Sequence, residues 1–184
     1  MAFAKPKKRE PVGEAGLFEY AVGALSRRMR TVRDLKRLMK PRAEEGETGE
    51  QAMNAVVERL IELKYLSDTR FAQDYTRMRK ENQGFGRRRV QQDLAIKGVD
   101  KELAATTLAA AYDEADEVAL ARAYCAKKRI KQPGEQKEVV RVMNRLMRAG
   151  YSSTAIFKLL RSWRVEVPEE GQSDSDQYGD LPEF

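Results

Sequence analysis

The chain has 184 residues, with 35 Lys and Arg against 29 Asp and Glu, which gives a formal charge of +6. It contains no His, so Ser-His-Asp and Cys-His nucleophiles, His-ligated metals and imidazole acid–base catalysis are excluded. The single cysteine, Cys125, excludes an internal disulfide and a CxxC metal site. We therefore expect no metal, no cofactor and no catalytic site.

The N-terminal residues 1–13 carry four bases and two prolines, which predicts a disordered basic arm. They lack the apolar run of a signal peptide. No stretch of the chain approaches the ~20 apolar residues of a membrane helix. Together with the lone cysteine, these features predict a cytoplasmic protein without a membrane partner.

The apolar residues beyond the arm recur with helical spacing, and no segment alternates as a strand does. This pattern predicts an all-α fold. The expected helices cover 16–30, 32–40, 50–64, 68–80, 87–97, 101–112, 114–130, 135–149 and 153–164. The longest internal loop is expected at about 41–49, where a proline, two glycines and an acidic run lie together.

The helix boundaries carry recognisable capping residues. Thr31 followed by Asp34 is typical of a capping box. Gly98 and Gly150 fall where helix C-caps are expected. The further N-cap candidates are Ser67, Asp100 and Ser152.

A sequence repeat divides the helices into three units. Leu94-Ala-Ile-Lys-Gly98-Val-Asp100 matches Leu146-Met-Arg-Ala-Gly150-Tyr-Ser152, 52 residues further on. The repeat predicts tandem three-helix units over 14–65, 66–112 and 113–165. Units this small must share packing with their neighbours, so we expect an elongated array.

The C-terminal residues 166–184 are rich in Pro, Gly, Ser and Asp, which predicts a disordered acidic tail. They hold seven acids and no base. Since 35 bases stand against the 22 acids that precede residue 166, residues 1–165 carry +13. Such a body favours a polyanionic or acidic partner, although a merely solvated surface is the plainer alternative.

Four basic clusters are candidate contact sites. The first lies in the +7 segment 27–42, and the third stands near a helix C-terminus, where cations are favoured in any case. Arginines at spacings of four and three line one face of the eighth helix. Outside the second cluster, the candidate residues are Arg27, Arg28, Arg30, Lys127, Lys128, Arg129, Arg141, Arg145 and Arg148.

The second cluster covers residues 77–97, where seven bases against two acids give +5. Its Arg87, Arg88 and Arg89 occupy the first turn of a helix, where the macrodipole disfavours cations. Local stability does not explain them, so a partner is favoured. The preceding Gly84-Phe85-Gly86 predicts a flexible loop with open backbone N–H groups that could hold phosphates or carboxylates. Phe85 could stack on a base or enter a partner's pocket, or it could be core. Gly-x-Gly alone is no nucleotide fingerprint.

Residues 63–99 resemble the central signature of the RecX family, regulators of the RecA recombinase. They read Leu-Lys-Tyr-Leu-Ser-Asp-Thr-Arg-Phe-Ala-x2-Tyr and then Gly-Phe-Gly-Arg-Arg-Arg-Val-Gln-Gln-Asp-Leu-Ala-Ile-Lys-Gly-Val. The similarity extends over roughly 17–163. Ser67 replaces the first Asp of the usual pair, and Arg87 stands where the family often has Pro.

The resemblance implies a non-enzymatic protein that binds the RecA–single-stranded-DNA filament along its groove. It implies inhibition of the ATPase and strand exchange, and so modulation of recombination and DNA repair. It also implies a monomer that makes weak direct contact with single-stranded DNA. Whether the bases meet acidic protein groups or DNA phosphates stays open.

An alternative is a direct DNA-binding helical protein, such as a helix-turn-helix regulator, without a recombinase partner. The basic body and short helices favour it. Against it, no helix carries Asn, Gln and Arg at base-reading positions, and the charge spreads over all three units.

Overall fold

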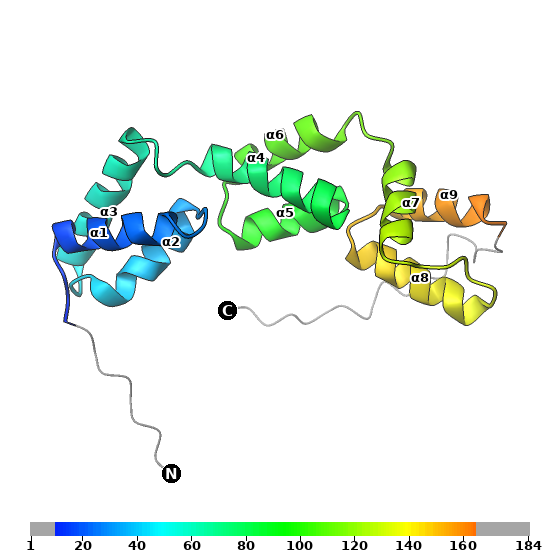
Figure 1. Ribbon diagram of the computed structural model, residues 1–184, viewed down its shortest axis with the longest axis horizontal. Helices are drawn as coiled ribbons and strands as arrows, with labels where there is room; N and C mark the ends of the chain where they lie inside the picture. Colours follow the sequence, from blue (N-terminus) through cyan, green and yellow to red (C-terminus); the bar gives the residue numbers. More distant parts are fainter. Residues whose placement is uncertain (1–9, 165–184) are drawn as a thin grey trace, which may run out of the picture.

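The computed structural model describes residues 10–164, and all regular structure in that range is helical (Figure 1). The helices are α1 Glu14–Leu25, α2 Val32–Met39, α3 Glu47–Glu62, α4 Asp68–Met78, α5 Arg87–Ile96, α6 Lys101–Tyr112, α7 Glu117–Lys127, α8 Gln136–Arg148 and α9 Ser153–Ser162. A short 3-10 turn, η1 Lys40–Arg42, follows α2, and a π turn, η2 Arg79–Gln83, follows α4. The prediction of an all-α fold is confirmed. No helix among these is long and apolar enough to cross a membrane.

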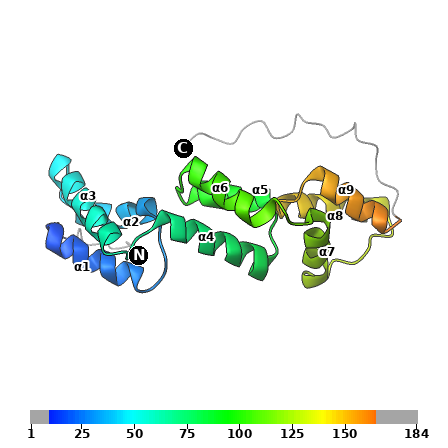
Figure 2. The same ribbon diagram turned by 90° about the horizontal axis from the view of Figure 1, so that it is seen from above.

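The helices follow one another along an elongated, shallow arc (Figures 1 and 2). The first group, α1–α3, lies at one end, the second group, α4–α6, in the middle and the third group, α7–α9, at the other end. Each group encloses an apolar cluster around a buried leucine of its middle helix: Leu35, Leu94 and Leu146. We propose on this basis that each group is one repeat, with boundaries at 65/66 and 112/113.

The predicted acidic tail, residues 166–184, and most of the predicted arm, residues 1–13, lie outside the described residues. Within the arm, the Val12 N–H donates to the Arg42 carbonyl at 2.8 Å. Val12 also packs against the first apolar cluster. The fold therefore begins before residue 13.

The predicted N-caps are confirmed. Thr31, Ser67 and Ser152 each accept a hydrogen bond from the backbone N–H three residues later, at 3.1–3.2 Å. Asp100 accepts from the first turn of α6, and these bonds lower its pKa. The sequence reading missed a fifth cap, Asp116, which accepts from Val118 and Ala119 and starts α7 three residues later than expected.

Two other boundaries differ from the prediction. The prediction of a loop over 41–49 is wrong at both ends, because Pro41 lies in η1 and α3 already begins at Glu47. Gly49 had indicated a loop, but it lies buried in α3, where a Cβ would collide with the Glu44 carbonyl. The expected helix 16–30 ends at Leu25, where the Ser26 hydroxyl turns back to the Gly23 carbonyl at 3.1 Å.

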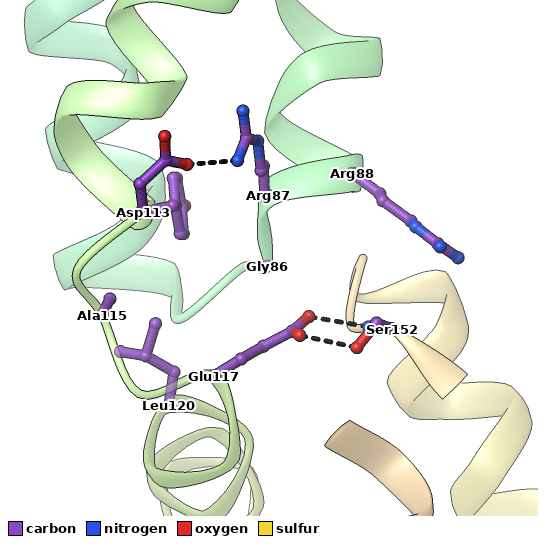
Figure 3. Close-up of a pocket in the computed structure, with 9 residues that line it drawn as sticks. Gly86, Arg87, Arg88, Asp113, Ala115, Glu117, Leu120 and Ser152 are labelled. Carbon is purple, nitrogen blue, oxygen red and sulfur yellow. Dashed lines mark hydrogen bonds and ion pairs between the residues drawn. The ribbon is translucent and has the colours of Figure 1, made fainter. Parts of the chain in front are cut away.

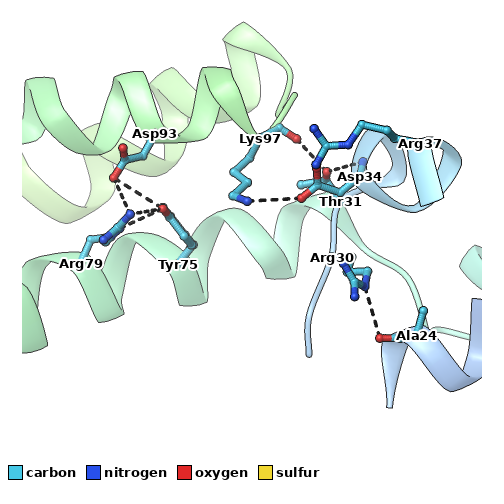
Figure 4. Close-up of polar contacts among 9 residues, drawn as sticks. All are labelled: Ala24, Arg30, Thr31, Asp34, Arg37, Tyr75, Arg79, Asp93 and Lys97. Atoms are coloured by element: carbon cyan, nitrogen blue, oxygen red, sulfur yellow. Dashed lines mark hydrogen bonds and ion pairs between the residues drawn. The ribbon is translucent and has the colours of Figure 1, made fainter. Parts of the chain in front are cut away.

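The N-terminus of α2 meets the C-terminus of α5 (Figure 4). Besides capping its own helix, the Thr31 hydroxyl donates to the Lys97 carbonyl at 2.7 Å. The Lys97 ammonium lies 3.4 Å from the buried Asp34 carboxylate. The Val32 N–H donates to Asp68 of α4 at 2.8 Å. This first junction joins the first and second groups through polar contacts.

The N-terminus of α5 meets the C-terminus of α8 in a similar way. The Gly86 N–H donates to the Ala149 carbonyl at 2.8 Å, and the Arg88 N–H donates to the Gly150 carbonyl at 3.3 Å. The free N–H groups of a helix start carry partial positive charge and the free carbonyls of a helix end partial negative charge, so the two ends satisfy each other. At this second junction and at the first, α8, α5 and α2 follow one another end to end along one edge of the arc (Figure 1).

A glycine stands at each junction because a side chain would not fit. Gly98 and Gly150 both have positive φ, +76° and +93°. A Cβ on Gly150 would collide with the backbone nitrogen of Arg89, and a Cβ on Gly98 would collide with the Arg33 side chain. A flexible side chain can move away, whereas helix backbone can do so only by opening the junction.

We therefore expect Gly150→Ala to lower the free energy of unfolding by about 2 kcal/mol or more, from left-handed strain and the backbone collision. Gly98→Ala should cost less, because the outer atoms of the Arg33 side chain can shift and only its Cβ, at 2.8 Å, then stays close. The control is Gly23→Ala, inside α1 with open space around it, which should stabilise by about 0.5–1 kcal/mol. Urea unfolding of the three variants checks this order. Equal losses at Gly98 and Gly150 would contradict it.

Candidate functional site

The exposed bases of α2, α5 and α8 lie on the line of end-to-end helices. We call six arginines among them the basic line: Arg33, Arg37, Arg88, Arg141, Arg145 and Arg148. Arg87 and Arg89, which pair with Asp113 and Asp93, and Lys137 are exposed bases of α5 and α8 that are not members. One member, Arg37, pairs with Asp34 at 3.1 Å. The other five have no ion pair within residues 10–164. Fixed, exposed cations along one edge are suited to an extended anionic partner.

The arginines that open α5 are not three equivalent free cations. Arg87 contacts the Asp113 carboxylate, and Arg89 lies 3.3 Å from buried Asp93, four residues along α5. Arg88 extends away from the Arg87–Asp113 pair, and no ion pair within the described part of the chain involves it (Figure 3). The sequence predicted that none of the three arginines has a structural role. This prediction is wrong for Arg87 and Arg89, which form ion pairs within residues 10–164, and no such pair involves Arg88.

The loop Gly84-Phe85-Gly86 is not an open anion cradle. The N–H groups of Gly86 and Arg88 are occupied by the carbonyls of Ala149 and Gly150. Gly84 closes η2 in a left-handed conformation, at φ +70°. The prediction of a flexible loop with open backbone N–H groups is wrong, since the C-terminus of α8 occupies the place where an anion was expected.

Phe85 lies half-buried between the second and third groups and packs against both of their apolar clusters. The guanidinium of Arg79 lies 5.4 Å from the centre of its ring, and that of Arg89 lies 5.8 Å away. The Phe85 carbonyl accepts from the Tyr112 hydroxyl at 2.8 Å. These contacts favour the core interpretation of Phe85 over a role in stacking on a partner.

The remaining candidates have different surroundings. Arg27 and Arg28 are exposed in the turn between α1 and α2, whereas Arg30 folds back so that its Nε donates to the Ala24 carbonyl at 3.3 Å (Figure 4). Burial, followed by the nearby Arg28, lowers the pKa of Arg30. Lys127 donates to the Glu81 carbonyl at 3.2 Å and so helps to hold the second and third groups together.

Two candidates stand at the C-terminus of α7. The Lys128 ammonium lies 6.0 Å from the centre of the Tyr124 ring. Arg129 is exposed and adopts a left-handed conformation, at φ +53°. The cations after this helix end also complement its free carbonyls.

The sequence reading missed a buried ionic contact between α4 and α5 (Figure 4). Asp93, only 6% exposed, lies 2.9 Å from the guanidinium of Arg79. Arg79 also donates to the Tyr75 hydroxyl at 2.6 and 2.9 Å. Burial raises the pKa of Tyr75. No spacing in the sequence could reveal the Arg79–Asp93 contact, because Arg79 lies in η2 and Asp93 in α5.

A polar cleft lies beside the second junction (Figure 3). Glu117 of α7 crosses it and accepts from the Ser152 N–H at 2.7 Å and from its hydroxyl at 2.6 Å, which closes the N-terminus of α9. The hydroxyl of fully buried Tyr151 donates to the carbonyls of Gly84 and Leu120, at 2.6 and 3.0 Å. Most polar side chains of the cleft are thus already engaged: Glu117 with Ser152 inside the third group, and Arg87 with Asp113. Within residues 10–164 no cluster of three or more potential ligands could hold a metal ion.

The phenols at this junction predict alkaline sensitivity. Burial raises the pKa of Tyr112 to about 12 and that of Tyr151 further. Because an unfolded phenol titrates near 10, the stabilisation is complete below pH ~10 and declines as the pH rises toward ~12. Each phenol should remove about 1.4 kcal/mol of stability per pH unit in that window. Urea unfolding between pH 8 and 11 measures this slope.

The double variant Tyr112→Phe/Tyr151→Phe should be less stable at pH 8, because three carbonyls lose a donor. Its stability should fall less steeply above pH 10 than that of the parent. Tyr65→Phe alters an exposed ring and should keep the parent slope. A double variant with the full parent slope would contradict the assignment to these two phenols.

Comparison with known proteins identifies the kind of protein that this array of three-helix groups represents. A family model described as RecX, second three-helix domain, matches residues 67–108. The regulatory protein RecX of Trichlorobacter lovleyi is 32% identical over 143 residues, which cover 76% of this chain and 90% of that protein. The regulatory protein RecX of Streptomyces coelicolor is 29% identical and covers 94% of this chain and 87% of that protein.

The chain spans only 59% of the length of another relative, the regulatory protein RecX of Bacillus velezensis, which is 27% identical over 159 residues. Two crystal structures share the fold. RecX from Lactobacillus salivarius gives a TM-score of 0.64 at 18% identity, over 82% of this chain and 96% of that one. A second regulatory protein RecX gives 0.65 at 22% identity, over 81% and 71%.

The fold and these relatives thus define an all-α regulatory protein built from three-helix groups. The chain belongs to the RecX family. The family resemblance found in residues 63–99 is confirmed.

Proposed function

We propose that this chain binds a RecA filament on single-stranded DNA and inhibits its ATPase and strand exchange, and so modulates recombination and DNA repair. The observation that carries the proposal is the basic line. At about 1.5 Å per residue, α2, α5 and α8 together contribute roughly 45 Å of helix. A body of this length can contact several protomers of a filament at once, and linked weak contacts raise the effective concentration of each.

The basic line can meet two kinds of anion in such a filament. Exposed guanidiniums bind carboxylates of protein and phosphates of DNA with similar geometry. The bases come from all three groups, which favours contact along the whole array over one recognition helix. One chain can make all of these contacts without a second copy. The proposal is therefore that the protein acts as a monomer.

The alternative of a helix-turn-helix regulator finds less support. Such proteins read base edges with residues near the N-terminus of one helix. Here the N-termini of α2, α5 and α9 are covered by Asp68, by the end of α8 and by Glu117, respectively. A titration on bare DNA separates the two functions. Tight, sequence-selective duplex binding at ~150 mM salt would favour the regulator, and weak, steeply salt-dependent binding favours the filament.

The direct test is DNA-dependent ATP hydrolysis by RecA under filament-forming conditions. We expect substoichiometric amounts of this protein to slow hydrolysis, because one chain contacts more than one protomer. Co-sedimentation with the filament, with and without DNA, should show association. An unchanged hydrolysis rate at equimolar protein would refute the proposal.

Arg88 provides the sharpest single-residue test, because it opens α5 without an ion pair in the described part of the chain. Arg88→Gln should leave the thermal midpoint within about 2 °C, since exposed substitutions without partners change stability little. Filament affinity should fall about fivefold, as expected for one lost charge-assisted contact. Lys101→Gln, which removes an exposed base of α6 outside the basic line, is the matched control. Equal affinity of the two variants would exclude Arg88 from the contact.

A further inference from the structure

The third group holds its bases without ion-pair partners. Residues 114–164 contain twelve bases and five acids. Every ion pair within residues 10–164 is formed by a base of residues 34–97, and none involves a base of this group. The first and second groups neutralise several of their bases internally, and the third group does not.

Three of the five acids in residues 114–164 are engaged elsewhere, and the other two, Glu114 and Glu135, are exposed. Asp116 caps α7, Glu117 accepts from Ser152, and Glu138 accepts from the Gly134 N–H at 2.9 Å. Carboxylates held by backbone N–H groups complement helix and turn dipoles rather than side-chain cations. The surface charge of this group is therefore strongly positive and open to an external acid.

The exposed surface of α8 combines these bases with apolar side chains. Val140 and Met147 lie two turns apart, so they share one face, and they are 45% and 47% exposed. Arg141, Arg145 and Arg148 stand beside them. We call these five residues the α8 face. An occupant that suits it carries several carboxylates and a few large apolar side chains.

A segment of this chain has that composition. Residues 166–184 hold seven acids, no base, and the apolar side chains of Tyr178, Leu181 and Phe184. They continue from the end of α9, where the Gln132 side chain contacts the Trp163 carbonyl and so joins this end to the basic loop after α7. At about 3.3 Å per residue the segment reaches up to ~60 Å, whereas α8 is only ~20 Å long. Length therefore does not prevent the contact.

We propose that residues 166–184 dock on the α8 face of the same chain. The acids pair with the three arginines, and the apolar side chains near the C-terminus cover Val140 and Met147. Because the segment is tethered, its effective concentration at the face is high even though each exposed ion pair is weak. The docked segment covers three of the six arginines of the basic line and competes with an anionic partner for them. This last consequence rests on the proposed function, and the docking itself does not.

Zero-length carbodiimide cross-linking of the intact chain, followed by peptide mass spectrometry, tests the docking. The reagent joins a carboxylate to a lysine only when the two are in contact. We expect acids of 166–184 to link to Lys131, in the loop before α8, and to Lys137, in its first turn, and not to Lys36, Lys40 or Lys101. The links should disappear in 0.5 M NaCl, where the Debye length falls to about 4 Å. Links spread evenly over all lysines, or links between different chains, would overturn the proposal.

A matched pair of triple variants locates the face. Arg141→Gln/Arg145→Gln/Arg148→Gln should lower the link yield roughly tenfold, from three lost surface pairs. The control Arg27→Gln/Arg28→Gln/Lys40→Gln removes three exposed bases of the first group and should leave the yield unchanged. Equal yields in the two variants would overturn the assignment to α8. Circular dichroism of both variants confirms that the fold is intact.

The regulatory consequence has its own readout. Replacing the seven acids of 166–184 with Asn and Gln should tighten filament binding severalfold at low salt and leave it unchanged at high salt. If the cross-links form but the protein never slows RecA hydrolysis, the docking stands and the proposed function fails. If hydrolysis slows but no links form, the function stands and the docking fails.

Discussion

The structure depends on the meeting of helix ends at its two junctions. A group of three short helices leaves free N–H and carbonyl groups at every helix end, and water would satisfy them in an isolated unit. Here the start of α5 binds the end of α8, and the start of α2 binds the end of α5. Each junction requires Gly98 or Gly150 at the helix end, because only glycine tolerates both the left-handed conformation and the close approach. The repeat seen in the sequence is thus the signature of the junction itself.

The two junctions differ in strength. The second and third groups share Phe85 and Leu120 between their apolar clusters, and buried Tyr151 ties both to the same loop. The first and second apolar clusters have no residue in common. Apart from Leu66, which lies at the boundary and packs in the first cluster, the contact between these groups is made by hydrogen bonds and the Lys97–Asp34 pair. Shared apolar side chains contribute to stability by excluding water, whereas a polar contact replaces hydrogen bonds to water and contributes less in net terms. The second and third groups therefore form the firmer part of the arc.

The sequence predicted the helices well, because apolar periodicity and capping residues depend only on neighbours a few positions away in the chain. Thr31, Ser67, Asp100 and Ser152 all cap as expected. Contacts between groups could not be predicted in this way. Arg87 looked free because Asp113 is far from it in the sequence. The loop before Arg87 looked open because the carbonyls that occupy its N–H groups belong to Ala149 and Gly150, much later in the chain. Gly49 misled for the same reason, since the carbonyl it accommodates lies outside its helix.

The charge on the surface is larger than the net charge of the chain indicates. Several acids have partners within the described part of the chain: Asp68, Asp116, Glu117 and Glu138 accept backbone N–H groups, and Asp34 and Asp93 are buried against bases. A carboxylate used in this way stabilises a helix start or a junction and contributes little negative potential to the outer surface. The bases, by contrast, have long side chains that extend from the short helices and keep their charged ends in water. Folding therefore separates the two signs of charge, with the acids holding the helices together and the bases left outside for a partner.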